Sequence, residues 1–174
     1  MAQRTLVNPR FRYNAEGLDA MATERRLVDA AETFEAGQFL RLATDGLIYA
    51  AVTDEDASTG GFQYFAMESV STALGNDTTR KKMAKITEGD IFEINAYHAT
   101  VASAVLTESM IGGLYALYVA NNVCSVDVSD TSNDAFELVE PSWVESPYNN
   151  TSSDTYARGL WKVIPAVLEA ARAS

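Results

Sequence analysis

The stretch from Gly112 to Pro141, GGLYALYVANNVCSVDVSDTSNDAFELVEP, decides the fold class of this 174-residue chain. Residues 114–120 are rich in aromatic and β-branched side chains, as in a strand, and Asn121-Asn122 suits a two-residue turn because Asn tolerates positive φ. Residues 123–128 alternate between apolar and polar, and residues 135–140 form a third β segment that is closed by a proline. We therefore predict a β meander that serves as scaffold and carries no chemistry.

Further β segments lie on both sides of this stretch. Residues 38–53 predict strand, turn and strand around Asp45-Gly46, and residues 62–67 predict another strand. Residues 82–97 predict a hairpin with its turn at residues 88–90, and residues 160–164 predict a last strand. The chain is therefore expected to be mainly β.

Helical patterns are few and short. Residues 24–36 have apolar side chains at helical spacing but lead directly into a predicted strand, so both helix and strand remain open there. Residues 99–110 are the best candidate for a helical turn or two. Residues 166–173 follow Pro165, which can start a helix, and predict a short C-terminal helix or an ordered tail. We expect at most one or two short helices.

Composition limits the class of protein. The single Cys124 cannot form an internal disulfide, and no apolar run approaches the roughly 20 residues needed to span a bilayer. Residues 1–25 lack the charged and apolar segments of a signal peptide, so we expect a soluble protein made in the cytoplasm. The length suits one compact domain with an appendage.

The net charge of −11 is distributed unevenly. Residues 1–15 contain three arginines and no acid, which makes them +3, so the other 159 residues sum to −14. A strongly acidic body argues against nucleic acid as a partner, because neutralising phosphates requires Lys and Arg. The basic N-terminal segment is then the expected contact with something acidic.

Residues 1–23 form an N-terminal arm that precedes a β-rich domain of residues 24–174. The arm shows no sustained strand or helix period, yet large apolar side chains lie among its arginines, which is unusual for a solvated tail. It either tucks onto its own domain as a strand or becomes ordered on a neighbouring subunit. Exposed ion pairs contribute only about 0–1 kcal/mol each, so burial of apolar side chains must supply much of any affinity. The candidate partner-binding residues are Arg4, Leu6, Val7, Arg10, Phe11, Arg12 and Tyr13.

No catalytic or metal-binding pattern stands out. His98 is the only histidine and no glycine-framed serine accompanies it, while Cys124 lies on the apolar side of a strand and is expected to be a small buried residue. One Cys and one His cannot build a zinc site from sulfur and nitrogen ligands, and the acidic run at residues 54–56 lacks calcium-loop spacing and is expected to be a solvated loop. Phosphate-binding glycine loops are absent as well. We predict a protein that is not an enzyme and has no cofactor or metal.

Several stretches carry a resemblance to a known family. They are FEAGQFLRL (residues 34–42) ahead of Asp45-Gly46, EGDIFEI (88–94), IGGLYAL (111–117) ahead of VDV (126–128), and RGLWKVIPAVL (158–168). In this loose pattern, which covers roughly residues 30–168, the chain resembles the head decoration, or capsid cement, proteins of tailed bacteriophages. The long arm and the extended loop at residues 142–157 depart from the smallest of these proteins.

The resemblance implies a small antiparallel β-barrel or β-tulip domain that sits on the outer surface of the virion capsid. It implies binding to the major capsid protein and to neighbouring copies, often as trimers, with no nucleic acid or membrane partner. Two alternatives remain: another β-rich virion component, such as a tail-tube, head–tail joining or fibre-base protein, and a β-barrel that holds a small molecule or glycan on its aromatic side chains.

Overall fold

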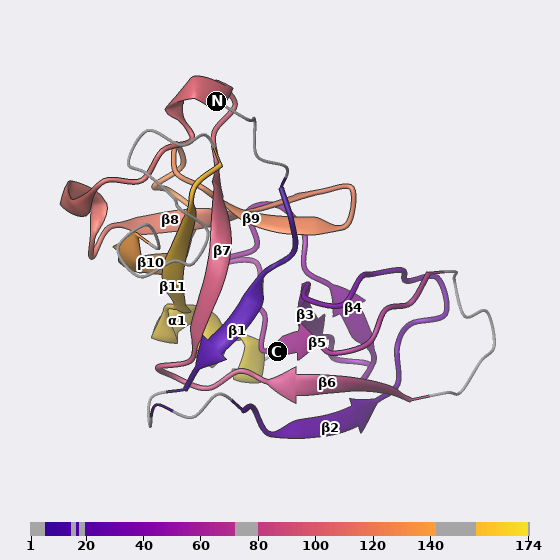
Figure 1. Ribbon diagram of the computed structural model, residues 1–174. Helices are drawn as coiled ribbons and strands as arrows, with labels where there is room; N and C mark the ends of the chain where they lie inside the picture. Colours follow the sequence, from indigo (N-terminus) through magenta and orange to yellow (C-terminus); the bar gives the residue numbers. More distant parts are fainter. Residues whose placement is uncertain (1–5, 15–16, 18–19, 72–79, 142–155, 174) are drawn as a thin grey trace.

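The computed structural model describes residues 6–14, 17, 20–71, 80–141 and 156–173 (Figure 1). In these ranges the chain has eleven β-strands, two 3-10 turns and one α-helix, and the strands form two sheets. The predicted mainly-β fold class is confirmed. No helix in the described ranges is long and apolar enough to cross a membrane.

Sheet A has six strands in the order β1-β7-β11-β10-β8-β9. They are β1 (Arg10–Tyr13), β7 (Ile91–Tyr97), β11 (Arg158–Val163), β10 (Asp134–Pro141), β8 (Leu114–Ala120) and β9 (Val123–Asp127). Neighbours in this order run antiparallel, and β9 adds a short parallel contact with the end of β7, at Ala96 and Tyr97. The single barrel that the resemblance implies is not confirmed, because the strands are divided between two sheets.

Sheet B has five strands in the order β2-β6-β5-β3-β4, all of them antiparallel to their neighbours. They are β2 (Thr23–Arg26), β6 (Lys81–Lys85), β5 (Tyr64–Ala66), β3 (Phe39–Leu42) and β4 (Ile48–Ala50). The hairpin of β3 and β4 confirms the strand–turn–strand prediction for residues 38–53. Figure 1 shows β2 and β6 along the lower border of the molecule, with β1 crossing above them.

Phenylalanine side chains join the two sheets into one core. Phe39 and Phe65 come from sheet B, and Phe92 and Phe136 come from sheet A; all four are buried. The ring of Phe39 lies 5.0–5.6 Å from the rings of its neighbours, within the range of favourable aromatic pairs. A smaller apolar cluster, which includes Phe34, Leu40, Ile48 and Met83, lies within the sheet B half. The interior is therefore filled by the chain's own side chains.

Helix α1 (Pro165–Ala173) confirms the predicted C-terminal helix. Proline suits the first helical position because the backbone N–H that it lacks would have no partner within the helix there. The helix buries Val167, Leu168 and Ala171, and the side chain of Gln63 donates to the carbonyl of Ala171 at 2.8 Å. The helix is thereby fixed to the segment just before β5.

Two predicted strand arrangements are wrong. Residues 82–97 do not form a hairpin, because β6 pairs with β2 and β5 in sheet B while β7 pairs in sheet A. The turn between them passes the chain from one sheet to the other, and the Asp90 carboxylate accepts the Thr87 N–H across it at 2.7 Å. Nor is the stretch that follows Gly112 a simple meander: β8 and β9 form the predicted hairpin, but β10 pairs with the opposite edge of β8.

The remaining local predictions, for short helices and loops, agree with the structure to different degrees. Residues 101–103 and 108–110 form 3-10 turns, in line with the helical turn or two expected over residues 99–110. The open question at residues 24–36 resolves into β2 and two isolated bridges rather than a helix. The acidic loop is not wholly solvated, because Glu55 and Asp56 are buried. Most of the extended loop expected at residues 142–157 lies outside the described residues, which resume at residue 156.

Candidate partner-binding surface

The N-terminal arm lies along one edge of β7. Arg10 pairs with Glu93 and Phe11 with Phe92 in an antiparallel register, and a bulge follows before Tyr13. The Phe11 ring packs edge-on against Phe92 at a centroid distance of 5.8 Å and joins the border of the core. The arm therefore adopts the first of its two predicted arrangements, a strand on its own domain, in residues 10–13.

Hydrogen bonds from the preceding residues continue this attachment. The backbone N–H of Val7 donates to Oδ1 of Asn95 at 3.2 Å, and the Cys124 N–H donates to Oδ1 of Asn8 at the same distance. Gly37 makes the approach possible, because a Cβ there would lie 2.9 Å from both Asn8 Cβ and the Pro9 carbonyl. The arm thus contacts β7, β9 and the segment that enters sheet B.

A buried ion pair lies beneath the arm. Nε of Arg158 is 2.9 Å from Oε1 of Glu93, with only 7% and 3% of the two side chains exposed. Arg158 also donates to Oδ1 of Asn95 at 3.1 Å and to the Glu93 carbonyl at 2.6 Å. Arg12 reaches the same carboxylate from the arm, with its NH1 3.4 Å from Oε2 of Glu93. Since a buried charge is tolerated only with such partners, this network fixes β1, β7 and β11 relative to one another.

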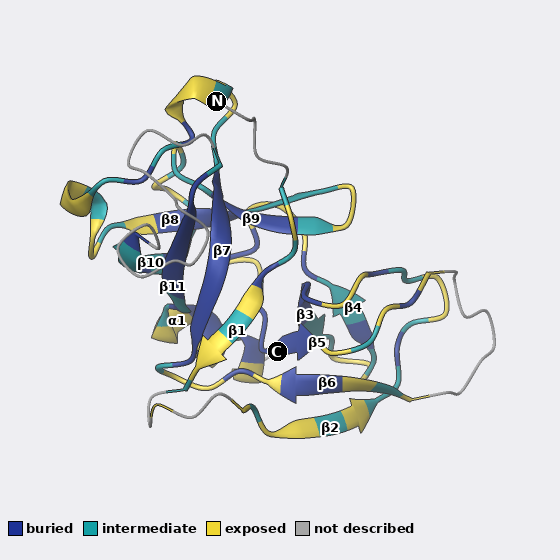
Figure 2. Ribbon diagram, in the orientation of Figure 1, coloured by how far each residue is buried: buried dark blue, intermediate teal, exposed yellow. Residues whose placement is uncertain are grey.

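The predicted partner-binding residues divide between two sides of the arm. Figure 2 shows β1 as exposed or half-buried, whereas β7 and β11 beside it are mostly buried. Phe11 points into the domain, while Val7, Arg10, Arg12 and Tyr13 keep exposed surface. Leu6 is half-buried, and Arg4 lies outside the described residues.

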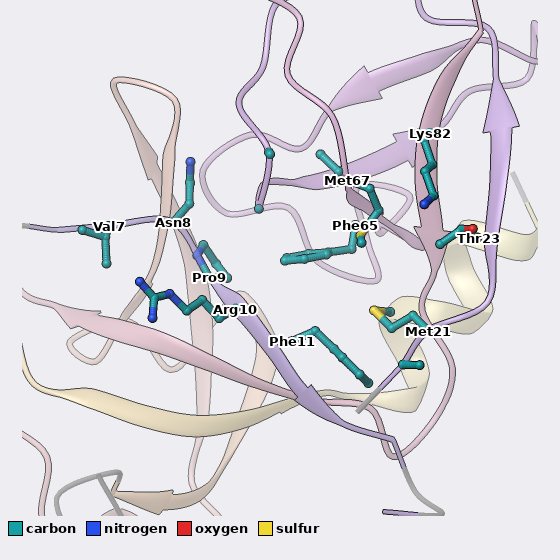
Figure 3. A pocket seen from close by; sticks show the side chains of 14 residues that line it. Val7, Asn8, Pro9, Arg10, Phe11, Met21, Thr23, Phe65, Met67 and Lys82 are labelled. Atoms are coloured by element: carbon teal, nitrogen blue, oxygen red, sulfur yellow. The ribbon is translucent and has the colours of Figure 1, made fainter. Parts of the chain in front are cut away.

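An open cleft of about 840 Å³ separates the arm from sheet B. Figure 3 shows Phe11 and Met21 on one side and Phe65, Met67 and Lys82 on the other. The full lining is Val7, Asn8, Pro9, Arg10, Phe11, Ala20, Met21, Thr23, Ala36, Gly37, Phe65, Ala66, Met67 and Lys82. This lining combines apolar side chains with two cations and contains no acid.

Sequence reasoning missed the sheet B side of the cleft and the buried network. Met67 is 42% exposed at the end of an otherwise buried strand, which alternation alone does not reveal. Glu93 and Asn95 occupy polar positions of β7 that ordinarily face water, and their burial depends on contacts with residues more than 60 positions away. The only local signal was their alternation with Phe92 and Ile94.

His98 and Cys124, the two residues that the sequence offered for chemistry, have structural surroundings. Nδ1 of His98 accepts the Thr100 N–H at 2.9 Å. Cys124 is fully buried, as predicted, and desolvation raises the pKa of its thiol to about 12. In the described part of the chain, no three His, Cys, Asp or Glu side chains are placed to hold a metal ion.

Burial also raises the pKa values of two acidic residues outside the arm, Glu55 and Asp90. Desolvation raises the pKa of Glu55, although the Val52 N–H and the Arg41 guanidinium oppose the shift. Desolvation raises the pKa of Asp90 in the same way, opposed by its hydrogen bonds from Thr87. Both carboxylates lie at turns that connect strands, which indicates a role in holding those turns.

No protein-family model matches the chain, and no curated protein matches it.

Proposed function

We propose that this protein is a structural virion component that binds the outer surface of a bacteriophage capsid and stabilises contacts between major capsid proteins. The proposal rests on the resemblance described above and on one structural observation. A basic arm is anchored to the domain by Phe11 and by the contact of Arg12 with Glu93, and it keeps exposed surface on Val7, Arg10, Arg12 and Tyr13, while the rest of the protein is strongly acidic.

This division suits a rigid contact surface. Because Phe11 and the hydrogen bonds of Val7 and Asn8 already hold the arm in place, binding through its outer side requires little further ordering of the backbone. The arginines favour an acidic partner, and partial burial of Val7 and Tyr13 adds apolar affinity, up to about 1.5–3 kcal/mol for a fully buried large side chain. Many copies around a closed shell would act together, and preferential binding to the assembled shell would stabilise it by mass action.

The test is co-sedimentation with expanded phage heads that lack decoration protein. Deleting the arm would also remove Phe11 and Asn8, so substitutions on its outer side are the sharper probe. We expect the native chain to pellet saturably with the heads, and the double variant Arg10→Glu/Tyr13→Ser to bind at least tenfold more weakly. The matched control is Arg172→Glu/Val52→Ser, which changes an exposed arginine and an exposed apolar residue away from the arm.

Equal pelleting of the native chain and the arm variant would move the capsid interface away from the arm. Absence of pelleting for the native chain would reject the cement function and favour another virion position. The alternative of a small molecule inside a barrel has less support, because phenyl rings fill the space between the sheets.

A further inference from the structure

The cleft beside the arm lies against two strands of sheet B, β2 and β6, whose composition is unusual for this chain. Residues 23–26 and 80–85, which we call the basic ribbon, contain six Lys or Arg and one Glu. Their charge is therefore +5, and the remainder of a chain of net charge −11 sums to −16. The ribbon consists of β2 and β6, and β2 is the edge strand of sheet B.

Strand register places Arg25 and Lys82 on the same face as apolar groups, whereas Arg26, Lys81 and Lys85 alternate to the opposite face. Arg25 is opposite Lys82 in the β2–β6 pairing, and the Met67 N–H donates to the Lys82 carbonyl on the other side. The next row on this face, two residues along β6, contains Thr23, Ala84 and Phe65. Thr23, Phe65, Met67 and Lys82 all line the cleft, so an apolar floor adjoins the Lys82 ammonium. One carboxylate, that of Glu68, lies beside this row and accepts the Lys82 backbone N–H at 3.1 Å.

The cations of this face differ in their partners. Arg25 forms an ion pair with Glu68 at 3.2 Å. Lys82 is exposed and forms no ion pair with any residue that the structure describes, and the same holds for Arg80, which precedes it by two positions. Arg80 directly precedes β6, and two residues of extended chain span about 6.5–7 Å, which sets the distance between Arg80 and Lys82 along the chain.

We propose that the cleft binds an extended acidic segment of a partner protein, with one large apolar side chain inserted beside Phe65 and Met67. Carboxylates two residues apart in that segment would match the spacing of Arg80 and Lys82. The apolar side chain would follow two residues beyond the carboxylate over Lys82, which places it over the row of Thr23 and Phe65.

Charge favours a short peptide segment over a nucleic acid. A long polyanion would meet the acidic remainder of the molecule, whereas a segment of a few residues would contact the ribbon alone. The aromatic rings of the cleft, Phe11 and Phe65, are half-buried and buried, so they do not offer the exposed stacking platforms that single strands use. Val7 and Arg10 of the arm also line the cleft, but the basic ribbon, Met67 and Phe65 lie outside the arm, and the proposal does not depend on capsid binding.

The probe is a short fluorescein-labelled peptide of serine with glutamate at two alternate positions and leucine two positions further along. A control peptide has the same composition but adjacent glutamates, which point to opposite sides of an extended chain. In fluorescence anisotropy titrations without capsids, we expect saturable binding of the first peptide and at least fivefold weaker binding of the second. Replacing the leucine by serine should weaken binding by a similar factor.

Variants of the protein locate the binding. Lys82→Glu should weaken peptide binding at least tenfold and Met67→Ser several-fold, while the matched controls Arg172→Glu and Val52→Ser should leave it unchanged. All four side chains are exposed, so we expect each variant to fold, and circular dichroism is the check. Lys82→Gln, which removes charge without reversing it, should have an intermediate effect.

The proposal is overturned if the two peptides bind equally, or if Lys82→Glu has no effect. It is also overturned if oligothymidine binds more tightly than the peptide, which would indicate a nucleic-acid surface. Concentration-dependent self-association that disappears in Lys82→Glu, measured by sedimentation velocity without peptide, would instead assign the cleft to a second copy of the chain.

Discussion

Arg158 and Glu93 form an ion pair at 2.9 Å beneath the N-terminal arm, where neither side chain has appreciable access to water. The two residues come from neighbouring strands of sheet A, and the arm adds Arg12 to the same carboxylate. The pair therefore couples the position of the arm to the pairing of β7 with β11.

Removing one member of this pair should be strongly destabilising. Glu93→Ala leaves the Arg158 guanidinium buried without its carboxylate, and we expect a loss of about 3–5 kcal/mol in the free energy of unfolding. Urea denaturation measures this loss. The double variant Glu93→Leu/Arg158→Met should recover part of it, because no buried charge remains, and a further loss in the double variant would contradict this account.

An exposed ion pair supplies the comparison. Nζ of Lys162 lies 3.0 Å from the Glu137 carboxylate, but both side chains retain about a third of their exposure. Lys162→Ala should cost no more than about 1 kcal/mol in the same denaturation experiment.

Phe11 should hold the arm to the domain. Phe11→Ala removes the edge-on contact with Phe92, and we expect a loss of about 1–2 kcal/mol because the side chain is only partly buried. Trypsin, which cleaves after arginine, should also cut the arm at Arg10 and Arg12 faster than in the native chain. Tyr13→Ala changes a neighbouring exposed residue and should have little effect on either measurement; equal proteolysis of both variants would show that Phe11 does not anchor the arm.

Stability should depend on pH through Glu55. Desolvation raises its pKa above the ordinary 4.5, so the folded state retains a proton at pH values where the unfolded chain has already lost it. The free energy of unfolding therefore decreases as pH rises from about 4.5 through the raised pKa. Glu55→Gln should reduce this decrease, as measured by urea denaturation at several pH values between about 4 and 7. If Glu55→Gln has the same pH profile as the native chain, the pH dependence of stability arises from other groups. Asp90, whose pKa is also raised, would then be the next residue to replace.

Cys124 should be unreactive in the folded protein. Its thiol is fully buried and its pKa is raised to about 12, so reaction with a disulfide reagent at neutral pH requires the structure to open. We expect slow modification of the native chain. After unfolding in guanidinium chloride, the single cysteine should react rapidly and release one equivalent of the reagent's thiol per chain. Fast stoichiometric reaction without denaturant would contradict the burial of this residue.

Sequence patterns predicted strands well where alternation and a strong turn coincide. Asn121 and Asn122 both adopt positive φ, of 51° and 60°, in the turn of the β8–β9 hairpin, which is the conformation that the Asn pair favoured. Pairing partners were harder to predict. The turn at residues 88–90 has a hairpin-like composition, yet the adjoining strands belong to different sheets because each pairs with more distant segments. A local turn signal does not specify which strand edge is available.

The candidate site shows the same limit. The arm's residue types indicated a contact segment, but nothing in the sequence of Phe11 and Arg12 shows that one packs inward and the other reaches a buried Glu93. The cleft arises only when the arm and sheet B are brought together by the common core. Nothing in the local sequence shows that the absence of a side chain at Gly37 allows Asn8 and Pro9 to approach.

The long-range docking of the arm also has a consequence for biosynthesis. Val7 and Asn8 bond to Asn95 and to the backbone of Cys124, which leave the ribosome much later than the arm does. Arg158, which completes the network under the arm, is later still. The arm must therefore remain undocked until most of the chain has been made, and its attachment is a late event in folding. During that interval its basic and aromatic residues are available to chaperones or to other nascent chains, so a segment that is made early is among the last parts of the fold to reach its final place.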